Sequence, residues 1–251
     1  LDPRNNDVWV NLARSYRGAR RFAEAHAMFD HALSIAPGSA AVIAEKSEAY
    51  RAAGDLDSSE RLLGPVPPEP DSELFDDYVT TFILRRDFAR ALEIYSNALT
   101  KKQPELEVFY TRLDIAYLHQ LTGRSEEAKP VFEEGRRKVE ELLAAGDQSL
   151  WLYGERLALA AALGDRATVE RESEALLRRT EKDRWRLPQS EHVVARAFAT
   201  LGDAERAIPH IERALSMPAQ YGLTQAYLRL DARWDRIRND PRFQKLAETK
   251  P

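Results

Sequence analysis

The sequence lacks cysteine and any long apolar run. The absence of cysteine among its 251 residues excludes disulfide frameworks, thiolate catalysis and Cys-ligated zinc sites, and it fits a reducing compartment. No apolar stretch approaches the roughly 20 residues that span a bilayer. The first residues, LDPRNN, contain neither an initiator Met nor a signal-peptide pattern. We therefore expect a cytoplasmic piece of a longer protein with no membrane partner.

Motifs that carry chemistry are also scarce. None of the five histidines stands in a His-Glu-x-x-His pair, and the sequence contains no Walker loop, no dinucleotide-binding glycine pattern and no Gly-x-Ser-x-Gly elbow. Pairs of carboxylates are frequent, but a solvated helix face is the ordinary reason for them in a chain so rich in charge. We expect no catalytic residues, no metal and no cofactor, and hence no enzyme.

The charge balance narrows the range of partners. Charged residues make up 31% of the chain and the formal net charge is −4, which argues against a general attraction to nucleic acid or anionic lipid. Basic doublets such as Arg85–Arg86 fall in expected turns or near helix C-termini, where the helix dipole favours cations. We expect no nucleic-acid partner.

The strongest positive feature is an internal repeat of about 34 residues. In its first copy large and small apolar residues alternate at fixed spacings, namely Trp9, Leu12, Ala13, Tyr16, Phe22, Ala25, Phe29, Ala32 and Pro37. Related patterns begin near residues 40, 72, 109, 150 and 188. Apolar residues recur every three or four positions within each half, so every copy predicts two helices.

The turn between the two helices of a copy has its own pattern. Glycine stands at the same place in four copies, as Gly54, Gly123, Gly164 and Gly202, which predicts a positive φ at the end of the first helix. In the first copy Arg20 stands there instead. Asp165, Asp203 and Ser125 are predicted N-caps of the second helices. Pro130 and Pro209 share one position early in a second helix, where proline is expected to kink it.

This alternation resembles the tetratricopeptide repeat (TPR). The resemblance implies an all-α fold, a right-handed superhelical solenoid of about six helical hairpins with a concave inner face. The expected array covers residues 1–218, with copies near 6–39, 40–64, 72–105, 109–144, 150–182 and 188–218. A C-terminal capping segment, 219–251, follows.

Two segments depart from the repeat. The proline-rich stretch at 64–73 predicts either a hinge between two sub-arrays or a stiff connector after a shortened helix. In the tail, apolar residues are expected to cover the sixth hairpin: Leu228, Leu230, Trp234, Ile237, Phe243 and Leu246. The tail resembles the end of C-terminal TPR regions in bacterial signalling proteins (kinases, nucleotide cyclases and winged-helix regulators), except that Ala232 and Arg236 stand where prolines are usual.

The resemblance implies that the first helix of each hairpin lines the concave groove. The residues expected to bind a partner there are Asn11, Arg14, Glu45, Glu48, Asp76, Asp77, Asp114, Tyr117, Glu155 and Arg196. Six of them are carboxylates, and like charges on one wall are costly without cations. The groove therefore either accepts a basic segment or is neutralised internally by Arg51 and neighbouring arginines. The acidic residues argue against the chaperone-tail clamp of some TPR modules, which needs the opposite charge.

The function predicted from these features is protein–protein interaction or scaffolding within a larger bacterial protein. The partner is expected to be a protein or peptide, basic in character, and a homo-oligomer stays open. The alternative is a ligand- or peptide-sensing regulatory array that controls an attached kinase, cyclase or DNA-binding domain. A catalytic domain in a preceding part of the protein is a further alternative.

Overall fold

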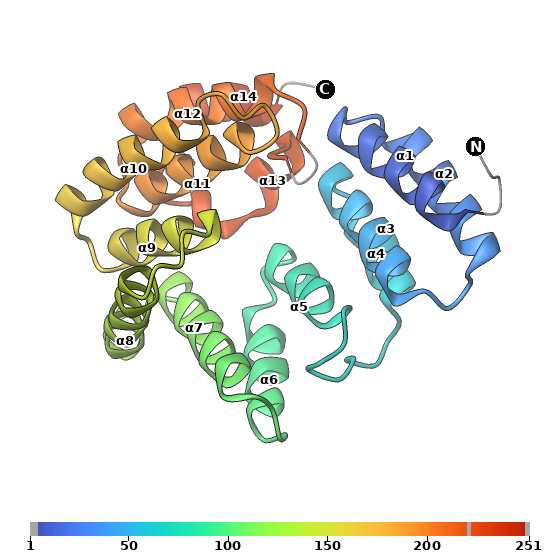
Figure 1. Ribbon diagram of the computed structural model, residues 1–251, viewed down its shortest axis with the longest axis horizontal. Helices are drawn as coiled ribbons and strands as arrows, with labels where there is room; N and C mark the ends of the chain where they lie inside the picture. Colours follow the sequence, from blue (N-terminus) through green and yellow to red (C-terminus); the bar gives the residue numbers. More distant parts are fainter. Residues whose placement is uncertain (1–4, 220–221, 249–251) are drawn as a thin grey trace. The chain divides into compact units, whose positions relative to one another are not determined.

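The computed structural model describes residues 5–219 and 222–248, and these divide into two compact units. Unit 1 contains residues up to Gln103 together with the stretch from Pro218 to Asp231. Unit 2 runs from Pro104 to Met217 and continues from Ala232. All regular secondary structure in the described residues is helical (Figure 1). The all-α prediction is confirmed.

Unit 1 is built from three helical hairpins and one short added helix. The hairpins are α1 (Asn6–Gly18) with α2 (Phe22–Ile35), α3 (Ala40–Ala53) with α4 (Leu56–Leu63), and α5 (Phe75–Leu84) with α6 (Phe88–Leu99). Helix α2 also packs on α3, and α4 packs on α5, so the hairpins stack in chain order. The added helix, α13 (Gln225–Leu230), packs on α3.

Unit 2 repeats the same plan. Its hairpins are α7 (Glu105–Leu121) with α8 (Ser125–Ala144), α9 (Leu150–Ala162) with α10 (Arg166–Thr180), and α11 (Leu187–Thr200) with α12 (Ala204–Ser216). Helix α8 packs on α9, and α10 packs on α11. The 3₁₀ turn η1 (Ala232–Trp234) packs on α11, and α14 (Pro241–Glu248) packs on α12.

Small residues lie where the helices approach closely, as the repeat predicts. Ala13, Ala25 and Phe29 are fully buried in one cluster of unit 1, with Trp9 and Tyr16 packed beside it. In unit 2 a Cβ at Gly135 would lie 3.1 Å from Cδ2 of Leu159. Since interiors are close-packed, a larger residue at such a position would push the helices apart.

The turns between paired helices adopt the predicted left-handed backbone. Gly54, Gly123, Gly164 and Gly202 have φ values of 89°, 82°, 75° and 74°. The equivalent turns of the first and third hairpins place Arg20 at φ 58° and Arg86 at φ 61°. A side chain in this region costs roughly 1–2 kcal/mol, so the packing of the hairpin imposes the turn even where no glycine is present.

The predicted N-caps of the second helices are confirmed in part. Asp165 accepts a hydrogen bond from the Thr168 amide at 3.1 Å, and Asp203 accepts one from the Arg206 amide at 3.2 Å, as predicted for N-caps. The prediction for Ser125 was wrong, because α8 begins at this residue and no side chain caps it. Pro130 and Pro209 lie at the same place in α8 and α12, and both helices continue past the proline.

The proline-rich stretch is a connector within unit 1. Helix α4 ends at Leu63 after only 8 residues, and α5 begins at Phe75. The hydroxyl of Tyr78 donates to the carbonyl of Pro65 at 3.3 Å, which ties the connector to α5. The chain divides into units after Gln103 and not in this stretch.

The tail is not a single cap on the sixth hairpin, as the sequence suggested. Trp234 belongs to unit 2, where it is fully buried with its ring centroid 5.9 Å from that of His192 on α11. Leu228 is also fully buried, but it lies on α13 in unit 1. The periodicity of the tail could not show this division, because apolar residues look alike whichever helix they cover.

The glycine of a hairpin turn gives the first testable prediction. Gly202→Ala should lower the free energy of unfolding by about 1–2 kcal/mol, because an added Cβ meets nothing within 4 Å and only the positive φ is penalised. Gly38→Ala is the matched control, since Gly38 has equal space and no positive φ. Urea unfolding followed by circular dichroism measures both, and equal effects of the two substitutions would contradict the prediction.

Candidate functional site

The residues predicted to line the groove lie on the first helices of the hairpins. Asn11 and Arg14 stand on α1, Glu45 and Glu48 on α3, and Asp76 and Asp77 on α5, all in unit 1. Unit 2 holds the others, with Asp114 and Tyr117 on α7, Glu155 on α9 and Arg196 on α11. The structure therefore gives two sets of candidate residues, one on each unit.

On α1 and α3 the acidic charge is matched by arginines. Glu45 is only 8% exposed, and one of its oxygens lies 2.7 Å from a guanidinium nitrogen of Arg14. The other oxygen lies 2.7 Å from Arg17, which also donates to the backbone carbonyl of Glu45 at 3.0 Å. Asn11 is exposed and accepts a hydrogen bond of 3.4 Å from Arg14. These contacts join α1 to α3.

Arg51 is the centre of a second cluster, which we call the Arg51 cluster (Glu48, Arg51, Asp76, Asp77). Its side chain is only 2% exposed, and its guanidinium forms an ion pair of 2.8 Å with Glu48 and another with Asp77. It also donates to Ser47 Oγ at 2.8 Å and to the Asp77 carbonyl at 3.1 Å. Burial alone would lower the pKa of Arg51, but Glu48 and Asp77 raise it above its ordinary value, so the group stays charged.

The Arg51 cluster carries more negative than positive charge. Burial raises the pKa of Asp77, Arg51 opposes that shift, and Glu48 and Asp76 add to it. Asp76 is exposed and forms no ion pair with any residue that the structure describes. Two carboxylates, Glu48 and Asp77, thus pair with the single guanidinium, and the further negative charge of Asp76 is exposed to solvent at the start of α5.

In unit 2 two of the candidate residues, Tyr117 and Glu155, form a hydrogen-bonded pair. The Tyr117 hydroxyl donates to Glu155 at 3.2 Å, and the Tyr117 ring centroid lies 4.9 Å from that of Phe132. Burial raises the pKa of both Tyr117 and Glu155, while the charge of Arg196 opposes both shifts. Asp114 adds to the rise of the Tyr117 pKa.

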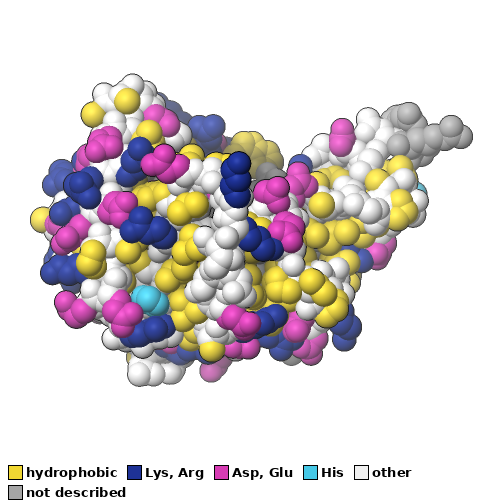
Figure 2. Space-filling view, turned by 90° about the horizontal axis from the view of Figure 1, so that it is seen from below, with side chains coloured by type: hydrophobic (Ala, Val, Ile, Leu, Met, Phe, Trp, Pro, Cys, Tyr) yellow, Lys and Arg dark blue, Asp and Glu magenta, His cyan; other side chains and the backbone are white. Residues whose placement is uncertain are grey.

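Unit 2 also has an open cleft that the sequence did not predict. It has a volume of about 480 Å³ and is lined by charged side chains of α8, α9 and α10. Arg156, inside it, pairs with Glu140 at 2.7 Å and with Glu172 at 3.0 Å. Basic and acidic side chains are likewise interspersed on the face shown in Figure 2. Opposite charges thus pair across this cleft.

The expectation that only first helices contribute groove residues missed one residue of unit 1, Tyr227. The Tyr227 hydroxyl, on α13, donates to the Glu48 carboxylate and lies 2.9 Å from both of its oxygens. No repeat pattern could place Tyr227 there, because the two residues are 179 positions apart. Within the described ranges, no group of three or more acidic or histidine side chains could hold a metal ion, and no helix is long and apolar enough to cross a membrane.

Comparison with known proteins supports the repeat assignment for part of the chain. Residues 16–74 match the tetratricopeptide repeat family. A tetratricopeptide repeat protein from Parabacteroides merdae ATCC 43184 is similar in structure, with 14% sequence identity, 97% of this chain and 92% of that chain covered, and a TM-score of 0.44. No curated relative matches the sequence. The segment from the end of α1 to the start of α5 thus carries the tetratricopeptide repeat signature.

Removing the cation of the Arg51 cluster should destabilise unit 1. Arg51→Met should cost about 3–5 kcal/mol of unfolding free energy, because it leaves Glu48 and Asp77 largely buried without their cation. Arg61→Met on the exposed side of α4 is the control and should change stability by less than about 0.5 kcal/mol. Urea unfolding of both variants checks this, and a loss in Arg51→Met no larger than in the control would contradict it.

The half-buried carboxyl of Glu155 in unit 2 predicts that the stability of the chain depends on pH. Because burial raises the folded-state pKa of Glu155, its ionised form costs stability, and this cost declines as pH falls from that raised pKa to the ordinary value of the unfolded chain. Glu155→Gln should therefore be more stable than the unsubstituted chain at pH 7, and the difference should shrink on acidification. In the intact chain the hydrogen bond from Tyr117 lowers the Glu155 pKa. Tyr117→Phe removes this bond and so raises the Glu155 pKa further, which should make the unfolding free energy depend more steeply on pH. Unfolding free energies measured against pH test both, and an advantage of Glu155→Gln that grows on acidification would contradict the sign.

Proposed function

We propose that this chain is a protein-interaction module that works by binding a segment of a partner protein and not by catalysis. Tetratricopeptide repeats generally mediate protein–protein interaction or scaffolding, and proteins built from them are generally not enzymes. The stacked hairpins of each unit support this function, because they present rows of first-helix side chains on a rigid frame. We further propose that the module serves a larger protein, in a scaffolding or regulatory role.

The proposed partner segment is basic, and the Arg51 cluster carries this proposal. Its three carboxylates exceed its one cation, and Asp76 brings the excess to solvent without an ion pair to any described residue. A lysine or arginine of a partner would pair with Asp76 without displacing an internal salt bridge. Glu45 is a weaker candidate contact, because Arg14 and Arg17 already occupy both of its oxygens.

The proposed contact predicts a charge preference in peptide binding. Fluorescence anisotropy with labelled cationic and anionic peptides of equal length should show tighter binding of the cationic ones, weakening as salt is added. Asp76→Asn should weaken cationic binding about two- to fivefold, since one exposed charge pair contributes about 0.5–1 kcal/mol. Asp71→Asn, which removes the same charge from the exposed connector, is the control and should change little. A preference for anionic peptides would overturn the proposal.

A further inference from the structure

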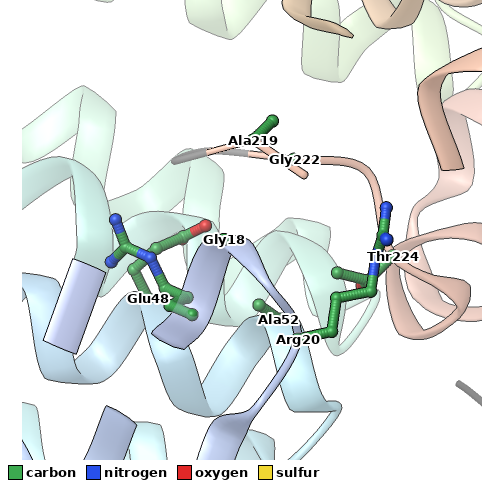
Figure 3. Close-up of a pocket in the computed structure, with 8 residues that line it drawn as sticks. Gly18, Arg20, Glu48, Ala52, Ala219, Gly222 and Thr224 are labelled. Carbon is green, nitrogen blue, oxygen red and sulfur yellow. The ribbon is translucent and has the colours of Figure 1, made fainter. Parts of the chain in front are cut away.

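A short segment of the C-terminal region lies on the first two hairpins of unit 1. We call residues 223–231, with the sequence LTQAYLRLD, the tail segment. Its helix α13 packs on α3, and its Tyr227 hydroxyl donates to Glu48. Arg20, in the turn after α1, donates to the carbonyl of Leu223 at 3.1 Å. Figure 3 shows the side chain of Arg20 beside Thr224. The tail segment is therefore hydrogen-bonded to α3, through Glu48, and to the turn after α1, through Arg20.

The fit between the tail segment and the hairpins is close. A Cβ at Gly54 would lie 3.2 Å from the Cβ of Ala226, so glycine at residue 54 lets α13 lie close against the turn between α3 and α4. Leu223, Ala226 and Leu228 are each at most 3% exposed. A space of only about 10 Å³ remains beside Glu48 and Thr224 (Figure 3), which is about the room that one water needs.

The tail segment joins unit 1 as a peptide would. Helix α13 has only 6 residues, and a helix this short is not stable in water without a surface to pack on. Its residues contact residues that are distant in the sequence: Arg20 and Leu223 are 203 positions apart. Helices α1 to α6 already pair with one another as complete hairpins. The segment thus adds to a frame whose own helix pairs are formed without it.

We infer that the surface made by α1, α3 and their turns is a peptide-binding surface, and that the tail segment occupies it as an intramolecular ligand. This inference deepens the proposed function, on which it rests, by naming one binding surface and its regulation. The partner that fits is a short helix with a small residue, a tyrosine and a leucine in succession, matching Ala226, Tyr227 and Leu228. The small residue packs on Gly54 and the tyrosine hydroxyl bonds to Glu48. Such a partner binds when the tail segment leaves, so the tail segment inhibits binding in the resting chain.

The test uses the full chain and a fluorescent synthetic peptide of residues 223–231. Ala226→Leu should release the tail segment, because the larger side chain collides with the turn at Gly54. The released variant should bind the peptide at least tenfold more tightly than the unsubstituted chain. Gln225→Leu, which adds a leucine at the first, half-buried position of the same helix, is the matched control and should bind like the unsubstituted chain.

The peptide itself tests the chemistry of the contact. A peptide with phenylalanine in place of tyrosine should bind the released variant about three- to tenfold more weakly. Glu48→Leu in the released variant should bring the two peptides to similar affinities, because leucine offers no oxygen to accept the hydroxyl. Equal binding of the two peptides before this second substitution would overturn the assignment of Glu48.

Hydrogen exchange of the Ala226→Leu variant separates a ligand from a structural element. If α1 to α4 keep their amide protection and the peptide binds, the inference stands. Loss of protection throughout these helices, or protection without peptide binding, overturns it. The proposed function is tested independently of this inference, because its charge preference is measured with substitutions at Asp76 on α5. A chain that prefers cationic peptides but ignores the tail peptide disproves only the inference, whereas the reverse result disproves only the basic partner.

Discussion

Close packing of paired helices is the constraint on which the rest of this structure depends. Helices approach one another most closely where one of them carries alanine or glycine, and the large residue beside it then fills the remaining space. Ala25 and Phe29 meet this requirement in unit 1, and Gly135 meets it in unit 2 against Leu159. Because this requirement recurs at each hairpin, the chain repeats it about every 34 residues. The turns follow from it, as the left-handed backbone of Arg20 and Arg86 shows.

This packing also places charged groups in the interior of unit 1. Arg17, Glu45 and Arg51 are all less than a tenth exposed, and each lies in an ion pair with a neighbouring hairpin or helix turn. Burying a charge without a partner is costly, so these groups are fixed relative to one another. The Ser47, Ser59 and Thr81 hydroxyls extend the network from α3 through α4 to α5. These polar and charged groups of unit 1 are consequently held in one fixed arrangement.

The chain passes more than once between its two units. It leaves unit 1 after Gln103, contributes Pro218 to Asp231 to that unit again, and returns to unit 2 at Ala232. Truncation within the tail would therefore remove contacts from both units, since Tyr227 bonds within unit 1 and Trp234 packs within unit 2. The repeats in the sequence suggest that each hairpin packs only on the hairpins next to it in the chain. The tail departs from that order, because residues 218–231 belong to unit 1 although the preceding hairpins belong to unit 2.

The sequence by itself determined the helices, the hairpins and the turns, because these depend on residues close together in the chain. The spacing of Trp9, Ala13 and Tyr16, the turn glycines and the caps at Asp165 and Asp203 were all readable from it. It also predicted which first-helix residues line a groove, but it did not show whether their charges were compensated. Only the tertiary structure decided that Arg14 and Arg17 share Glu45, that Arg51 joins Glu48 to Asp77, and that Tyr227 reaches Glu48. Such contacts depend on the packing of side chains from separate helices, and no periodicity along the chain encodes them.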